Sequence, residues 1–403
     1  MTLFEELKWR GLIQDISSPE LEEKLNKGGM TFYIGTDPTA DSLHLGHYSS
    51  FLITKRLVKA GHKGVILVGG ATALIGDPRG TGERELAVKE VVERNFIGLK
   101  AQVEKLFGLP VVNNYDWIKN INLIDFLRDY GKQISVNYML AKDLIRRQLE
   151  TGISYAEFSY TLLQGLDFKH LHDTMGVNLQ VAGSDQWGNI TTGIELIRRM
   201  EGEEVFAFTM PLIVDSHGKK FGKSEGNAVW LDKNKTSPYK LYQYLINSED
   251  SMVISYLKKL TFLSKDEIDE IEKEQNKAPE KRIAQKRLAY EVVKDLHGEQ
   301  EAINAKKTSE ELFVNGGVDL GDMPTVEIKK SDINAGKSIL DLLVEAGLAE
   351  SRGEAKRLIQ GGGVSLNRNK ITDIQKTITL ADLTEENNIL QKGKKNFVKV
   401  IVK

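Results

Sequence analysis

The chain has 403 residues, 40% of them hydrophobic, so it is long enough for two or three globular domains with a substantial core. Its 55 Lys and Arg against 57 Asp and Glu leave a net charge of -2, which excludes a uniformly basic nucleic-acid coat, and the absence of cysteine excludes disulfides, thiolate zinc sites and a cysteine nucleophile. No leader-like apolar segment follows the start and none later approaches 18 residues, so we expect a cytoplasmic protein without membrane contact.

Residues 1–230 have the pattern of a doubly wound α/β domain with a parallel sheet. The apolar runs 32–34 and 65–68 lack the polar alternation of a half-exposed strand, which is typical of buried parallel strands. Each run is followed by glycine and a polar loop, at 35–42 and 69–82. Open α/β sheets bind ligands at the carboxyl ends of their strands, so we expect the site in these loops.

The remainder divides into a helical stretch, 231–320, and a basic C-terminal module, 336–403. The module carries 12 Lys and Arg against 8 Asp and Glu, which is a mild pointer to nucleic acid. Apolar positions 339, 342, 343 and 346 predict a helix that ends near Gly347. Ser351, with Glu354 three residues later, predicts a capping box at the start of a second helix, followed by a strand and turn.

The segment 36–47 leaves a predicted strand, turns through Pro38 and enters a helix with His44 and His47 on one face. Free N–H groups and the helix dipole favour an anion at a helix N-terminus, and two imidazoles beside them would bind phosphate oxygens. Gly46, without a Cβ, would let an adenine ring approach the helix backbone. Ordinary surface histidines or a metal-binding pair are the alternatives for an arbitrary HxxH.

The second candidate element is the glycine-rich basic loop 218–227, which follows the apolar run 211–214. Lysines on such a loop can reach a polyphosphate. Taken alone, the loop is better explained as solvated surface, so the phosphate interpretation depends on its combination with the histidine element.

HLGH near residue 45 and KFGKS near residue 222, in that order, resemble the two signatures of class I aminoacyl-tRNA synthetases. The segments 33–39, 75–78, 160–167 and 183–189 are similar to those of the bacterial and organellar tyrosyl-tRNA synthetase family, and the resemblance covers nearly the whole chain. It implies a Rossmann-like catalytic domain over 1–230 with an insertion at about 108–192 that forms a dimer interface. It further implies an α-helical anticodon-arm-binding domain over 231–320 and an RNA-binding domain like ribosomal protein S-four over 336–403.

The implied reaction joins tyrosine and ATP to tyrosyl-adenylate and pyrophosphate, then transfers tyrosine to the 3′ end of tRNA(Tyr). ATP is a substrate that arrives with Mg²⁺, and we expect no tightly bound cofactor and no metal held by the protein. The tyrosine carboxylate is itself the nucleophile, so the protein contributes positioning and stabilisation of charge. The partners implied are tRNA(Tyr), tyrosine, ATP and a second copy of the chain.

The resemblance assigns residues to four groups. The catalytic residues it implies are His44, His47, Lys220, Lys223, Ser224 and Thr39. The tyrosine-binding residues are Tyr33, Asp77, Tyr160, Gln164, Asp167 and Gln186. The ATP-binding residues are Asp37, Gly46, Asp185 and again Lys223. The RNA-binding residues, taken from the charge of the C-terminal module, are Arg352, Lys356, Arg357, Arg368 and Lys370.

Three departures from the family pattern, at Ile34, Ser50 and Thr81, and three rivals remain. Thr81 stands where many relatives carry a lysine, which leaves open whether Arg84 replaces it. Tryptophanyl-tRNA synthetase shares the fold and both signatures, but Asp167 and Tyr33 suit a phenol better than an indole. A second rival is a non-catalytic RNA-binding relative, against which the intact signatures count. A third is a small-molecule adenylyltransferase, against which the RNA module counts.

Overall fold

The computed structural model describes residues 1–77, 87–149, 152–219, 221–224, 227–310, 324–367, 369–383, 388–393 and 396–403. It divides into two compact units. Unit 1 holds residues 1–235 and 249–284, and unit 2 holds 236–248 and 285–403. None of the helices in these described ranges is both long and apolar enough to span a bilayer.

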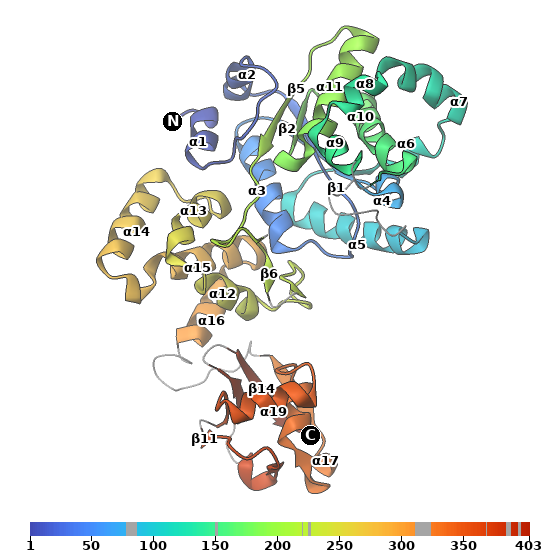
Figure 1. The fold of residues 1–403 in the computed structure, drawn as a ribbon. Coiled ribbons are helices and arrows are strands. Elements are labelled where there is room, and N and C mark those ends of the chain that lie inside the picture. Colours follow the sequence, from blue (N-terminus) through green and yellow to red (C-terminus); the bar gives the residue numbers. More distant parts are fainter. Residues whose placement is uncertain are drawn as a thin grey trace. The chain divides into compact units, whose positions relative to one another are not determined.

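Unit 1 is built on a five-stranded parallel sheet in the order β3-β2-β1-β4-β5 (Figure 1). The strands are β1 (Thr31–Thr36), β2 (Lys63–Val68), β3 (Val111–Asn113), β4 (Leu179–Gly183) and β5 (Phe206–Met210). The two apolar runs noted in the sequence therefore form the neighbouring buried strands β1 and β2, as predicted. The strand order reverses between β1 and β4, where an open parallel sheet offers a crevice for ligands.

Helices cover both faces of this sheet (Figure 1). Tyr33, Val65 and Leu67 pack against Phe168 and Leu171 on one face. That face is covered by α10 (Tyr155–Met175) and α11 (Trp187–Glu201), and the other by α3 (Leu45–Lys59) and α5 (Lys89–Phe107). The expected doubly wound arrangement is confirmed.

The connection between β3 and α10 is a run of short helices. They are α6 (Tyr115–Ile118), α7 (Leu123–Asp125), a π-turn (Phe126–Tyr130), a 3₁₀ turn (Gly131–Gln133), α8 (Val136–Leu140) and α9 (Asp143–Leu149). The stretch 134–149 has a helix-like apolar pattern without glycine or proline, but the chain breaks at Ala141 into α8 and α9. Next to that break the Lys142 ammonium donates to Gly188 O at 2.6 Å and Thr191 Oγ1 at 3.0 Å, contacts that a continuous surface helix would not supply.

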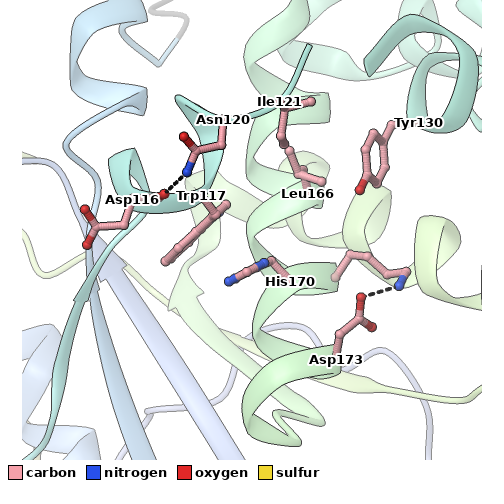
Figure 2. Close-up of a pocket in the computed structure, with 9 residues that line it drawn as sticks. Asp116, Trp117, Asn120, Ile121, Tyr130, Leu166, His170 and Asp173 are labelled. Atoms are coloured by element: carbon pink, nitrogen blue, oxygen red, sulfur yellow. Dashed lines mark hydrogen bonds and ion pairs between the residues drawn. The ribbon is translucent and has the colours of Figure 1, made fainter. Parts of the chain in front are cut away.

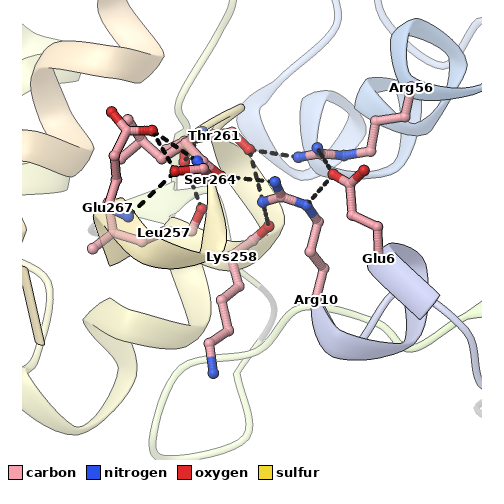
Figure 3. Close-up of polar contacts among 9 residues, drawn as sticks. Glu6, Arg10, Arg56, Leu257, Lys258, Thr261, Ser264 and Glu267 are labelled. Carbon is pink, nitrogen blue, oxygen red and sulfur yellow. Dashed lines mark hydrogen bonds and ion pairs between the residues drawn. The ribbon is translucent and has the colours of Figure 1, made fainter. Parts of the chain in front are cut away.

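Two buried arginines tie the N-terminal helix α1 (Leu3–Trp9) and α3 to the end of α13 (Asp250–Leu260) (Figure 3). Arg10 donates to the carbonyl oxygens of Lys258 at 2.8 Å and Leu263 at 2.8 Å, and Arg56 donates to that of Thr261 at 2.5 Å. Both guanidinium groups also contact the Glu6 carboxylate. The carbonyls at a helix C-terminus lack intrahelical donors, so these arginines satisfy them and hold α13 against the nucleotide fold.

Unit 1 also contains α2 (Leu21–Lys27), α4 (Thr72–Ile75), the 3₁₀ turn Ser184–Gln186, the short strands β6 (Lys223–Ser224) and β7 (Asn227–Ala228), α14 (Lys265–Lys277) and the 3₁₀ turn Pro279–Lys281. Unit 2 begins with α12 (Pro238–Ile246), which packs on α16 (Glu299–Glu310). The helix α15 (Ile283–His297) has nearly its whole length in unit 2. The helical stretch expected over 231–320 is therefore shared between the two units.

The C-terminal part of unit 2 has a five-stranded sheet in the order β11-β10-β13-β14-β8. Its strands are β8 (Thr325–Ile328), β10 (Val364–Leu366), β11 (Asn369–Lys370), β13 (Asn388–Lys392) and β14 (Asn396–Val402). The helices beside it are α17 (Lys330–Asn334), α18 (Ile339–Glu345), α19 (Arg352–Gln360) and the 3₁₀ turn Leu380–Asp382, and β9 (Lys337–Ser338) pairs with β12 (Thr377–Ile378). Because β8 pairs with β14, this sheet starts upstream of residue 336.

The two predicted C-terminal helices are present. Ile339, Leu342 and Leu343 are buried, and Ser351 caps α19 by accepting from Glu354 N at 3.2 Å. The predicted capping box is only half formed. The Glu354 carboxylate accepts from Glu350 N at 2.8 Å and from Lys392 Nζ at 3.0 Å instead of from the cap residue.

Candidate functional site

The HLGH element starts α3 directly after the loop that leaves β1. His44 is the N-cap, and its Nδ1 accepts from His47 N at 3.3 Å, while His47 Nδ1 accepts from His44 N at 3.3 Å. The two rings stack with their centroids 3.9 Å apart. Burial, and to a smaller degree the neighbouring His44, lowers the pKa of His47 to about 3, so His47 is neutral at pH 7. Nδ1 accepts in each ring, so a neutral ring has its N–H donor at Nε2.

The glycine-rich loop approaches this helix start through its backbone. A Cβ on Gly222 would lie 2.6 Å from Gly46 N, so the two glycines permit a contact that side chains would block. Leu45 N donates to Val229 O at 2.7 Å, and Val229 N donates to Gly222 O at 2.9 Å. The structure therefore brings the two predicted signatures together.

The described residues cover these signatures only in part. Lys220 lies outside them, and Lys223 and Ser224 are described as backbone in β6. Thr81 and Arg84 also lie outside them. The phosphate contacts assigned to these side chains stay predictions.

A buried carboxylate lies on α10, beneath the sheet crevice. Asp167 is 1% exposed, and it accepts from Asn114 Nδ2 at 2.9 Å and from Trp117 Nε1 at 3.0 Å. Burial raises the pKa of its carboxyl to about 7, although the hydrogen bonds from Asn114 and Trp117 oppose the shift. Tyr33 is 1% exposed, and its hydroxyl makes no hydrogen bond within the described part of the chain.

Burial, followed by the proximity of the Asp167 carboxylate, raises the pKa of Tyr33 well above its usual range. Tyr33 therefore remains a neutral hydroxyl at pH 7. A buried hydroxyl without a partner costs free energy until a ligand supplies one. Tyr33 and Asp167 are thus two neighbouring buried polar groups at one end of the candidate site.

Asp37 connects this end to the β1 loop. It accepts from Thr72 Oγ1 at 3.0 Å and from Tyr160 Oη at 3.4 Å. Thr72 Oγ1 also accepts from Asn114 Nδ2 at 3.0 Å, which completes a polar chain from Asp37 to Asp167. The predicted ATP-binding and tyrosine-binding residues thus share one hydrogen-bond network.

A second carboxylate lies where α4 ends. Asp77 accepts from Gln186 Nε2 at 2.8 Å and from Asn189 Nδ2 at 3.2 Å, and Asn189 Oδ1 accepts from Thr161 Oγ1 at 2.9 Å. Two residues predicted for the tyrosine site, Asp77 and Gln186, are therefore in direct contact. Gln164 lies on α10 one turn before the position of Asp167 and is half-buried.

The predicted residues nearest solvent lie on the loops. Thr39 is exposed, and its N–H donates to Asp37 O at 2.8 Å. Asp185 is exposed at the end of β4. In the C-terminal module Arg352, Lys356, Arg357 and Lys370 are exposed, and Arg352 contacts Asp341 at 3.3 Å; Arg368 lies outside the described residues.

A cavity of about 410 Å³ lies behind the buried carboxylate (Figure 2). Trp117 forms one wall, stacking on His170 with ring centroids 4.4 Å apart, while its indole N–H donates to Asp167. Its remaining lining residues are Asp116, Asn120, Ile121, Tyr130, Leu166, Lys169 and Asp173. Trp117 alone links this cavity to the polar network, so we do not assign the cavity to the candidate site.

Sequence reasoning missed four residues of the network, namely Thr72, Asn114, Trp117 and Asn189. Asn114 and Trp117 follow β3, and Thr72 follows β2, so the carboxyl-end rule for parallel strands was the available signal. Asn189 follows the predicted pair 185–186 by three residues, which places it on the same side of the helix start.

Comparison with known proteins agrees with this geometry. Residues 25–314 match the family model of class I tRNA synthetases (W and Y), and residues 316–400 match that of the tyrosine–tRNA ligase SYY-like C-terminal domain. Tyrosine–tRNA ligase 2 of Streptococcus thermophilus is 62% identical over 74% of this chain and 98% of its own length. The tyrosine–tRNA ligase of Macrococcus caseolyticus is 48% identical over 99% of both chains.

Among solved structures, a C-terminally truncated mitochondrial tyrosyl-tRNA synthetase of Aspergillus nidulans superposes with a TM-score of 0.71. It is 33% identical, and the match covers 77% of this chain and 94% of that one. The parallel sheet with its helices, the paired signatures and these matches define a class I aminoacyl-tRNA synthetase. Within that class, the chain belongs to the tyrosine–tRNA ligase family.

Proposed function

We propose that the chain activates tyrosine with ATP to tyrosyl-adenylate and pyrophosphate, and then transfers tyrosine to the 3′ end of tRNA(Tyr). The observation that carries the tyrosine assignment is this pair of neighbouring buried groups. The Tyr33 hydroxyl has no hydrogen-bond partner among the described residues, and the Asp167 carboxylate lies near enough to raise its pKa. A phenol hydroxyl supplies both the donor and the acceptor that this pair requires.

The adenylation step needs no protein nucleophile. A carboxylate oxygen of tyrosine attacks the α-phosphorus of ATP, and the bond from that phosphorus to the pyrophosphate oxygen breaks. We assign His44 and His47 to the phosphates, where their Nε2–H groups donate to oxygens that gain charge in the transition state, His47 as a neutral imidazole. Thr39, Lys220, Lys223 and Ser224 are proposed for the phosphate end, with Mg²⁺ entering as part of the ATP complex.

The proposed roles of the other residues follow from their positions near the carboxyl ends of the strands. We place the tyrosine ammonium among Asp77, Tyr160 and Gln164, with Gln186 beside them, because a buried ammonium requires a carboxylate and further acceptors. The ATP ribose and base belong with Asp37, Gly46 and Asp185 at the carboxyl ends of β1 and β4.

The first test is pyrophosphate exchange with each of the twenty amino acids. We expect exchange with tyrosine and not with tryptophan. Tyr33→Phe removes only the hydroxyl, and we expect it to lower the ratio of specificity constants for tyrosine over phenylalanine by about fivefold to tenfold, the value of one hydrogen bond. Tyr239→Phe is the matched control, because Tyr239 is also buried, its hydroxyl has no partner in the part of the chain that the structure describes, and it lies on α12. Exchange with tryptophan, or no exchange with any amino acid, would overturn the assignment.

We also propose that the chain is a homodimer through the insertion between β3 and β4. Large apolar side chains are exposed along this segment: Leu123 at 69%, Ile124 at 64%, Val136 at 59%, Leu149 at 51% and Tyr155 at 72%. Monomeric proteins rarely leave so many exposed, and a second copy would bury them. Tyr155→Asp should convert a dimer to a monomer in light scattering, whereas Ile97→Asp, at a site 69% exposed on α5, should not. A monomeric wild type would refute the proposal.

The C-terminal module is proposed as an RNA-binding domain like that of ribosomal protein S-four. Exposed Arg352, Lys356 and Arg357 on α19, together with exposed Lys370 on β11, offer cations for tRNA phosphates. We assign the helices of the 231–320 stretch to binding of the tRNA anticodon arm. Because the proposed reaction charges tRNA for translation, we propose that the protein acts in the cytoplasm. Salt-dependent binding of tRNA(Tyr) that weakens in Lys356→Gln supports this role, and unchanged binding contradicts it.

A further inference from the structure

One cluster of metal-ligating side chains in the described ranges lies outside the candidate site. It consists of His172, Glu201 and Glu203, whose ligand atoms all lie within 4.8 Å of one another. His172 occupies the last turn of α10, Glu201 ends α11, and Glu203 follows two residues later. We propose that this cluster is a binding site for one divalent zinc ion that braces the ends of α10 and α11.

The hydrogen bond on the far side of the imidazole fixes its tautomer. His172 Nδ1 lies 2.8 Å from Val177 O, and a carbonyl oxygen can only accept, so Nδ1 carries the proton. Nε2 is then the nitrogen left to coordinate an ion, and it faces two carboxylates, Glu203 Oε2 at 3.1 Å and Glu201 Oε2 at 3.4 Å. One cation could contact all three groups, because their ligand atoms lie within 4.8 Å of one another. Zinc-binding histidines commonly donate their second N–H to a backbone carbonyl in this way.

The separations fit a tetrahedral ion. Bonds of about 2.0–2.2 Å to nitrogen and oxygen give ligand-to-ligand distances of about 3.3–3.5 Å in a tetrahedron. The two observed distances, 3.1 Å and 3.4 Å, are close to these values before any adjustment of the flexible glutamates. Imidazole with carboxylates is a donor set that Zn²⁺ accepts, and water would complete the fourth position.

The surrounding charge also favours a cation. Lys169 contacts both Asp173 and Glu201, so two carboxylates share one ammonium, and the Glu203 carboxylate lies beside them at His172. The C-terminal ends of α10 and α11 add the negative poles of their dipoles. Arg198 and Arg199, the nearest arginines on α11, pair with Glu195 instead. The carboxylates of Asp173, Glu201 and Glu203 therefore outnumber the one ammonium of Lys169.

The test is titration of the full-length, EDTA-treated protein with Zn²⁺ by isothermal calorimetry. We expect one saturable site that is lost in His172→Gln and weakened about tenfold or more in Glu203→Gln. Glu204→Gln is the matched control, because Glu204 is an exposed neighbour outside the cluster, and its binding should equal that of the wild type. Co²⁺ in the same site should show the visible absorption of a tetrahedral ion.

Because Glu203 is 64% exposed, its substitution leaves the fold intact and gives an answer even if His172→Gln is unstable. Zinc should raise the melting temperature of the wild type and not that of Glu203→Gln. No saturable binding would mean that a proton on His172 alone bridges the carboxylates. Equal binding by all variants would place the ion elsewhere, for example at the His44 and His47 pair, and either result overturns the proposal.

Discussion

The Asp167 carboxyl is buried beneath the sheet crevice, and its pKa of about 7 gives it a measurable effect on stability. In the unfolded chain an aspartate titrates near pH 3.9, so between these two pKa values the folded state binds more protons. The contribution of Asp167 to the free energy of unfolding is complete below about pH 4 and is lost as pH rises toward 7. The cause is burial of the carboxylate, which raises the pKa by more than the two hydrogen bonds lower it.

Asp167→Asn should remove this dependence. We expect the free energy of unfolding of the variant, minus that of the wild type, to rise by on the order of 3 kcal/mol between about pH 4 and pH 8. Denaturant unfolding at several pH values, without substrates, measures it. Other carboxylates cancel in the difference, since both proteins carry them. A difference that is constant with pH would show that Asp167 is already ionised throughout.

His44 has two roles that substitution can separate, because it caps α3 and faces the proposed phosphate position. Asparagine is a good N-cap residue, so His44→Asn keeps the helix start while removing the Nε2–H donor. We expect the rate of adenylate formation to fall about 10²-fold, with the dissociation constant of tyrosine changed less than about twofold. Single-turnover kinetics measure both quantities. A parallel loss in tyrosine affinity would mean that His44 acts on the ground state.

At the scale of elements, the buried arginines define how α13 is held to α1 and α3 (Figure 3). Arg10→Met removes hydrogen bonds to three carbonyl oxygens in a buried interface. Lys258 O and Leu263 O lose this donor, whereas Thr261 O keeps the hydrogen bond from Arg56. We expect a loss of about 2–4 kcal/mol in unfolding free energy, less than for a fully broken ion pair because Arg56 still contacts Glu6. Lys8→Met, an exposed change on the same helix, should cost less than about 0.5 kcal/mol in the same denaturant experiment. Equal effects of the two changes would contradict this account.

The elements that the sequence predicted best are those with a strong local pattern. Buried β1 and β2 follow from unbroken apolar runs, and the N-terminus of α3 follows from the turn through Pro38. The apolar pattern of 134–149 has no strong breaker, so the break at Ala141 was not predictable from it. The contacts of Lys142 next to that break involve α11, far away in sequence.

The candidate site shows the same limit. His44, at the start of α3, and Asp77, after α4, were predicted from their motifs, but Asn114 and Trp117 were not predicted. These two residues belong to no motif. They donate to Asp167 only because the fold brings the segment after β3 against α10. Long-range hydrogen bonds of this kind leave no periodicity in a single sequence.

At the scale of the whole molecule, residues 249–284 belong with the nucleotide fold although their helices follow α12, which lies in unit 2. A sequence read in order could not divide the helical stretch in this way, because the division depends on buried contacts such as those of Arg10 and Arg56. The C-terminal sheet poses a similar problem, since β8 pairs with the last strand of the chain.

The pairing of β8 with β14 decides where a truncation must fall. A cut before Gly336 would leave Thr325–Ile328 without its partner strand, whereas a chain ending at residue 323 removes the sheet as a unit. We expect this truncated chain to form tyrosyl-adenylate within about twofold of the wild-type rate, since the polar network lies wholly in unit 1. Charging of tRNA(Tyr) by the truncated chain should be about tenfold or more below that of the full-length chain at low salt. The difference should narrow as added salt weakens the phosphate contacts that only the full-length chain makes. Full-length Lys356→Gln/Arg357→Gln keeps the sheet and should show part of the same loss. Both reactions belong on one folded preparation of verified oligomeric state. Wild-type charging by the truncated chain at every salt concentration would show that the C-terminal module does not bind the tRNA.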